Sequence, residues 1–189
     1  MKNSFLILLT AIVLLAALSL GTAAAEGGSS RLFCYVTSES SDRLDVLSDA
    51  EEFMTFRLDE DVTIQSATGV LWLDDAVLIA YTGSLNPNTQ EQSVRVDKIE
   101  VLPVFNGRVE GDDAGTLSIR AIDDDGQDAE LYLFDKDAVD ILVGEEGIVR
   151  GDEVEVAYAG DASMLRPNQT QRLGYVHVTV YGQVEDAFE

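Results

Sequence analysis

The chain carries nearly the same stretch of sequence twice. Residues 75–83 read DAVLIAYTG and residues 152–160 read DEVEVAYAG, and the 32-residue window around them contains seven identical positions at a fixed offset of 77. The match continues upstream at an offset of 73 and downstream at 81, where Thr89-Gln90 aligns with Thr170-Gln171. Both changes of offset fall in predicted turns, where insertions are tolerated. The sequence therefore predicts one fold unit that occurs twice.

Both copies show the period-two alternation of half-buried strands. Val154, Val156 and Tyr158 alternate with Glu153 and Glu155, for example, so the two sets point to opposite faces. The alternation slips near Asp97-Lys98, which predicts a bulge. The predicted strands are 32–36, 43–47, 53–58, 76–81 and 94–101 in the first copy, and 105–109, 117–122, 130–134, 153–158 and 176–181 in the second.

The order of these strands predicts the fold class. In each copy three strands are followed by an irregular link and then by two more strands, which is the order of an OB-fold, a small five-stranded barrel. In the second copy the link DKDAVDILVGEEGI fits a short helix or turn capped by Asp135 or Asp137. We therefore expect an all-β protein of two tandem five-stranded OB-like barrels, or one duplicated β-sandwich.

The first 25 residues have the pattern of a secretory signal peptide. Lys2 is followed by an apolar run from Phe5 to Leu20, and Ala23–Ala25 offer a small-residue cleavage site, which indicates Sec export. An uncleaved segment would leave a membrane anchor. The expected organisation is signal peptide 1–25, linker 26–30, OB-like repeats 31–104 and 105–184, and acidic tail 185–189.

Charge excludes one common class of ligand for an OB-fold. The chain has 35 acidic and 12 basic residues and a net charge of −23, which becomes −24 once the segment with Lys2 is removed. Such a surface repels nucleic acid, whose binding needs Lys and Arg to neutralise phosphates. Cys34 is the one cysteine, so no internal disulfide forms, and its apolar surroundings RLFCYV predict a buried thiol.

The end of the second copy resembles a known kind of domain. The segment GIVRGDEVEVAYAG, followed by MLRPNQTQRLGYVHVTV, covers residues 147–180. It is similar to small exported bacterial OB-like β-domains of unknown function. The resemblance implies an exported protein of the cell envelope or the extracellular space, and it brings no catalytic residues to this chain.

The second and third strands of an OB-fold form its usual ligand face. In the second copy the residues expected on that outer face are Arg120, Tyr132 and Phe134, which suit a glycan or peptide ligand. The alternative is that Tyr132 and Phe134 pack against the first copy and fill the seam between the two.

Two chemical alternatives remain open. Calcium prefers several oxygen ligands from a tight loop, and Asp123, Asp125 and Asp128 surround the Gly126 turn, although the loop does not fit an EF-hand. A hydrolase would use a pair of acids that the sequence does not single out. His177, the one histidine, is expected to point outward from its strand between two inward valines, which does not favour a catalytic triad.

Together these patterns predict an exported, non-enzymatic binding or structural module of the cell envelope or extracellular space. Its expected partner is a protein or glycan, with no nucleic acid, no cofactor other than calcium, and membrane contact only through an uncleaved N-terminal segment. The alternatives are a calcium- or cation-binding extracellular domain and a hydrolase.

Overall fold

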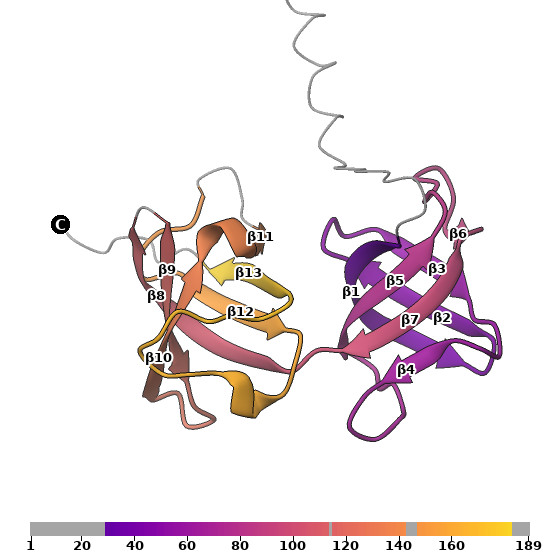
Figure 1. Ribbon diagram of the computed structural model, residues 1–189. Coiled ribbons are helices and arrows are strands. Elements are labelled where there is room, and N and C mark those ends of the chain that lie inside the picture. The colour runs from indigo at the N-terminus through magenta and orange to yellow at the C-terminus, as the bar shows by residue number, and fades with distance from the viewer. Residues whose placement is uncertain (1–28, 114, 143–146, 183–189) are drawn as a thin grey trace, which may run out of the picture.

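The structure, a computed structural model, describes residues 29–113, 115–142 and 147–182. It is all-β and forms two tandem OB-like β domains that lie side by side (Figure 1). The predicted signal peptide and acidic tail lie outside the described residues. The first domain contains β1 (Ser30–Ser40), β2 (Arg43–Ser48), β3 (Phe53–Arg57), β4 (Thr63–Gln65), β5 (Ala76–Thr82), β6 (Glu91–Gln92) and β7 (Arg95–Val101). The second contains β8 (Val104–Asp113), β9 (Thr116–Ile122), β10 (Asp128–Asp135), η1 (Lys136–Ala138), β11 (Asp140–Leu142), β12 (Glu153–Tyr158), η2 (Ala162–Met164) and β13 (Val176–Gly182).

The sheet of the first domain closes on itself. Its strand order is β4-β7-β5-β1-β2-β3-β6, and all neighbours in the run β7-β5-β1-β2-β3 are antiparallel. The short β6 leads directly into β7 but pairs in parallel with β3, where Thr55 faces Glu91. Because β6 lies at one end of this order and β7 lies next to the other end, the segment that contains both brings the two edges together. Pairing Ala80 with Lys98 and Tyr81 with Val96 leaves Asp97 as an extra residue, which confirms the predicted bulge.

The second domain repeats this plan in the order β10-β9-β8-β12-β13-β11. Here the loop before β13 runs parallel to β10 and forms a bridge between Leu133 and Thr170. The backbone N–H of Gln171 donates to the carbonyl of Leu133 at 2.7 Å. Each sheet encloses its own apolar core instead of sharing one with the other sheet, so the chain forms two barrels and the alternative of one duplicated sandwich is wrong. No helix in the described part of the chain is long and apolar enough to cross a membrane.

The repeated stretch of sequence builds the same turn and strand in both domains. A side-chain oxygen of Asp75 accepts the N–H of Trp72 at 2.7 Å, and one of Asp152 accepts the N–H of Val149 at 2.8 Å. Both strands end at a glycine with positive φ, Gly83 at 120° and Gly160 at 127°, a conformation that other residues rarely adopt. The sequence repeat therefore encodes the same local structure twice: a turn held by an Asp side chain before the strand, and a glycine with positive φ after it.

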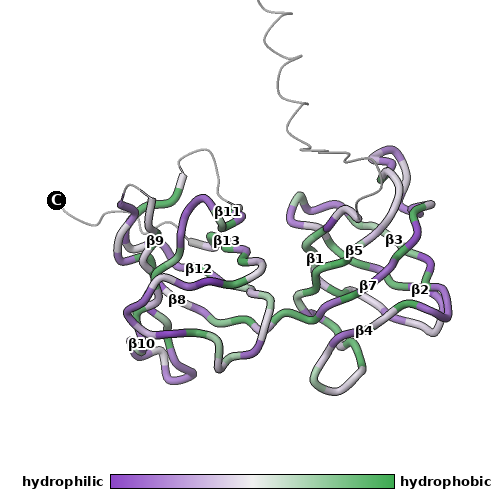
Figure 2. The backbone as a smooth tube through the Cα atoms, in the orientation of Figure 1, coloured by the Kyte–Doolittle hydropathy of each residue, from purple (hydrophilic) through white to green (hydrophobic). Residues whose placement is uncertain are grey.

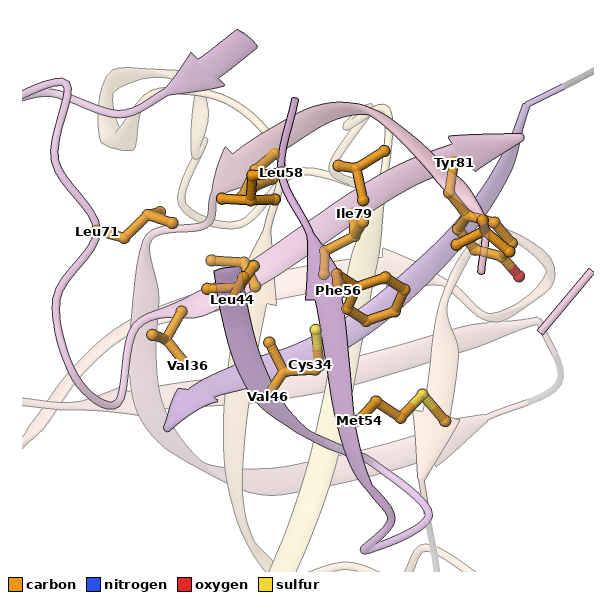
Figure 3. Packing of buried hydrophobic residues seen from close by; sticks show 14 residues of the cluster. Cys34, Val36, Leu44, Val46, Met54, Phe56, Leu58, Leu71, Ile79 and Tyr81 are labelled. Atoms are coloured by element: carbon orange, nitrogen blue, oxygen red, sulfur yellow. The ribbon is translucent and has the colours of Figure 1, made fainter. Parts of the chain in front are cut away.

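Each barrel has its own apolar core. In the first domain the inward side chains of β1, β2, β3 and β5 point toward one another (Figure 3). Cys34, Leu44 and Phe56 are completely buried there, and burying a side chain of the size of Leu or Phe contributes about 1.5–3 kcal/mol. Burial raises the pKa of Cys34 well above its ordinary value, so the thiol stays protonated, and its predicted burial is confirmed.

A third apolar cluster lies between the two domains. Phe33 of β1 stacks on His177 of β13 with ring centroids 3.9 Å apart. The hydroxyl of Tyr35 donates to Glu155 across the same boundary at 2.7 Å. The hydrophobic colouring continues through the connection from β7 to β8, where Leu102 is buried (Figure 2). We call this cluster the seam, and its members are Phe33, Tyr35, Ala76, Leu78, Leu102, Ala157, Ala159, Tyr175 and His177.

Candidate functional site

The predicted ligand face of the second domain does not form one surface. Phe134 is only 1% exposed and lies in the barrel core, so the expectation that it points outward is wrong. Leu117 pairs with Phe134 as Leu44 pairs with Phe56, which makes the two phenylalanines equivalent core residues. The sequence alignment at offset 77 places Phe56 opposite Leu133 instead of Phe134, an error of one residue. A shift of one residue exchanges the two faces of a strand.

Arg120 and Tyr132 belong to different surroundings. Tyr132 is half-buried against the core and lies 5.3 Å from Phe105 between ring centroids, so it faces inward like Phe134. Arg120 binds both carboxylate oxygens of Glu110 and lowers the pKa of that acid. It also donates to the carbonyl of Ala129 at 3.1 Å. The seam alternative for Tyr132 and Phe134 is also wrong, because both pack within their own barrel.

The acidic turn after β9 uses its own carboxylate to hold its shape. One side-chain oxygen of Asp123 accepts the N–H groups of Asp125 and Gln127 at 3.0 and 2.8 Å. Asp128 lies 3.7 Å from Arg108. Across the described ranges, no three His, Cys, Asp or Glu side chains are gathered as a metal-binding group. In the described structure Asp123 therefore holds the turn, and Asp128 lies near a guanidinium.

A hollow of about 620 Å³ lies on the first domain, between β2, β3 and the segment around β6. This is the position where strands two and three of an OB-fold and its loops take ligands. Its volume lies within the range of small-molecule sites. The residues that line it are Asp42, Arg43, Thr55, Phe56, Arg57, Asp59, Glu91, Gln92, Ser93 and Val94.

Two of the residues that line this hollow, Arg43 and Thr55, form a small polar network with Asp45. Arg43 donates to Asp45 at 2.9 Å and to the hydroxyl of Thr55 at 3.3 Å, and that hydroxyl donates to Asp45 at 2.6 Å. The hydroxyl of Thr55 and the guanidinium of Arg43 together hold the pKa of Asp45 below its ordinary value. Since every member has a partner in the network, the donors and acceptors are held in fixed directions before any ligand arrives.

Arg57 adds a second guanidinium beside this network. It pairs with Arg43 in the register of β2 and β3, and it forms no ion pair with any described residue. Asp42, Asp59 and Glu91 complete the rim. The lining thus carries three carboxylates and two guanidiniums and has a net negative charge. This charge opposes a phosphate backbone, and the lining offers both donors and acceptors to a neutral hydroxyl-rich ligand.

Gln92, a buried residue of the lining, holds the loop that precedes it. The amide of Gln92 donates to the carbonyls of Asn86 and Thr89 and accepts the N–H of Asn86. Gln171 does the same for Arg166 and Gln169 in the second domain. Gln92 and Gln171 are therefore equivalent, and the predicted match of Thr89-Gln90 with Thr170-Gln171 is wrong. The signal that could have found this is the shared Leu-x-Pro-Asn at 85–88 and 165–168.

Comparison with known proteins adds little to this geometry. No family model matches the chain, and no curated protein matches it. A solved structure of Drosophila Unr, CSD456, is similar at 14% identity with a TM-score of 0.30. The similarity covers 85% of this chain and 64% of that one, so the chain spans about two thirds of its length. This is a weak OB-like β resemblance, from which no function follows.

Proposed function

We propose that the protein is an exported, non-enzymatic binding module that takes a neutral oligosaccharide in the hollow of the first domain. The observation that carries the proposal is that Arg43 and Thr55, which line a hollow of about 620 Å³, are fixed in a hydrogen-bond network with Asp45. Sugar hydroxyls both donate and accept hydrogen bonds, so a fixed set of charged donors and acceptors suits them. The excess of acid on the rim disfavours polyanions such as nucleic acid.

Binding rather than catalysis is supported by where the two most reactive side-chain types lie. The one histidine, His177, is 3% exposed in the seam, and the one cysteine, Cys34, is completely buried in the core. Neither lines the hollow of the first domain. Export to the envelope or the extracellular space is part of the same proposal and rests on the sequence pattern of residues 1–25.

The test uses residues 26–189 on an array of neutral oligosaccharides, followed by calorimetric titration of the best hit. We expect Arg43→Ala and Thr55→Val each to weaken binding about tenfold or more, because each removes a donor from the lining of the hollow. Arg150→Ala is the matched control, since Arg150 is exposed on the other domain and should leave affinity unchanged. Equal retention by the wild type and Arg43→Ala, or no retained glycan at all, would refute the proposal.

A further inference from the structure

The outer face of β1, β5 and β7 is built of three rows of side chains. The strand registers align Arg31 with Ala80 and Lys98 in the first row, and Phe33 with Leu78 and Glu100 in the second. The third row contains Tyr35, Ala76 and Leu102. The face therefore changes along the strands from charged to apolar.

The second domain covers only part of this face. Phe33, Leu78 and Leu102 are buried in the seam, but Arg31 is exposed and Lys98 is half-buried. Beside the seam the two domains form a groove of about 560 Å³. One wall is the row of Arg31, Ala80 and Lys98, together with Leu78, Asp97 and Glu100. The residues of the other wall are Ala159, Gly160, Met164, Arg172, Leu173 and Gly174.

The charges of this groove differ from those of the rest of the molecule. Although acids outnumber bases 35 to 12 in the chain, three basic side chains line this one groove. Its two acids already have partners, because Glu100 lies 2.7 Å from Lys98 and Asp97 accepts the hydroxyl of Thr82 at 2.8 Å. Arg31 and Arg172 form no ion pair with any residue that the structure describes. One guanidinium from each domain is thus free to bind an anion.

The groove also offers apolar surface next to these guanidiniums. Leu78 and Ala80 lie on one wall, and Ala159, Met164 and Leu173 lie on the other. A ligand that suits both features carries one carboxylate on a short apolar chain, because guanidinium pairs with carboxylate in two parallel hydrogen bonds. A polyanion is disfavoured by the net charge of −23.

We propose that the groove between the two domains is a second binding site, which holds an aliphatic monocarboxylate. Arg31 of the first domain and Arg172 of the second donate to its carboxylate, and its apolar chain lies against Leu78, Met164 and Leu173. The ligand bridges the two domains, so it stabilises their packing as well as its own position.

The test titrates residues 26–189 with octanoate by calorimetry and repeats the titration with octanol. We expect octanoate to bind at least about tenfold more tightly than octanol, and to lose about tenfold or more in affinity in Arg31→Gln or Arg172→Gln. Octanoate should also raise the melting temperature of the wild type but not that of Arg31→Gln. N-acetyl-Gly-Leu and its amide form a further arm: a preference for this acid over octanoate assigns the carboxylate to a peptide end and overturns the aliphatic assignment.

Arg43→Ala separates this proposal from the glycan site. It should leave octanoate binding unchanged, because Arg43 lines the hollow on β2 and β3 and not this groove. Equal affinity for octanoate and octanol, no heat with octanoate, or unchanged affinity in both Arg31→Gln and Arg172→Gln would overturn the second site. None of these results bears on the glycan array.

Discussion

His177 is a polar residue placed among aromatic rings. It stacks on Phe33 with ring centroids 3.9 Å apart, and the nearly parallel ring of Tyr175 lies 6.4 Å away. Neither ring nitrogen of His177 has a hydrogen-bond partner among the described residues. Burial lowers the pKa of its imidazole, and the carboxylates of Asp49, Asp140 and Glu155 only partly oppose that shift. The folded protein therefore favours the neutral ring.

This placement predicts a loss of stability in mild acid. The unfolded chain takes up a proton at His177 near pH 6.5, whereas the folded chain does so only at lower pH. Its contribution to stability is thus complete above pH 6.5 and is lost as the pH falls toward the lowered folded value. We expect the melting temperature to fall between pH 6.5 and about pH 5, above the range where most carboxylates titrate.

His177→Phe keeps the stacked ring and removes the titration, so its melting temperature should stay flat over the same interval. Because the chain has one histidine, no other imidazole contributes to the difference. Parallel pH curves for the wild type and the variant would contradict this explanation.

The sequence predicts the direction in which His177 points, but it does not predict that the side chain is buried. The alternation of Val176, His177 and Val178 correctly indicates that the valines face the barrel and the histidine faces away. It carries no information about what lies beyond the barrel. The outward side is buried here because another domain, more than 130 residues earlier at Phe33, packs on it.

At the scale of elements, the glutamine pins are the feature that both barrels share at their closure. We expect Gln92→Ala and Gln171→Ala each to lower the free energy of unfolding by about 1–3 kcal/mol, since each removes three hydrogen bonds between a buried side chain and the loop backbone. Urea denaturation measures the difference. Gln90→Ala is the matched control, because Gln90 is exposed and its side chain is not part of the pin. If the urea midpoints of Gln92→Ala and Gln171→Ala equal that of Gln90→Ala, the two loops are stable without the glutamine side chains.

The strands themselves follow closely from the alternation of residue types. Every predicted strand overlaps an observed one, and the bulge at Asp97 lies where the pattern slips. In the third strand of the second copy, the prediction of which side chains point into the barrel is wrong. Leu131, Tyr132, Leu133 and Phe134 are all apolar or aromatic, so the alternation there does not say which set is inward. The pairing of Phe134 with Leu117 decides it.

At the scale of the whole molecule, the seam joins two barrels that each have a complete core. Phe33→Ala removes an aromatic ring of the first domain that is buried in the seam and stacks on His177 of the second. We expect it to lower the free energy of unfolding by about 3 kcal/mol and to separate one calorimetric transition into two, because the domains then unfold independently. Phe53→Ala is the matched control, since Phe53 is 59% exposed, and it should keep a single transition. A single transition in both variants would mean that the seam does not couple the domains.

The candidate sites are formed by contacts between segments that are far apart in the chain. The hollow on the first domain forms only when β6 returns beside β3, and the groove forms only when two domains meet. Neither juxtaposition follows from local periodicity, because each brings together residues far apart in the chain. The sequence alone therefore does not predict a binding site on the first copy, although it contains Arg43 and Arg57.

Only Leu102 and Pro103 separate β7 from β8, and both lie at the boundary between the domains. The N–H of Leu102 donates to the carbonyl of Ala76 at 2.8 Å. The carbonyl of Pro103 accepts the N–H of Tyr158 at 3.1 Å. So short a tether gives each barrel a very high effective concentration of the other. The seam is spared most of the loss of translational and rotational freedom that two separate proteins incur when they associate. A modest patch of side chains is therefore enough to keep the barrels together, and one small bridging molecule is enough to shift that balance measurably.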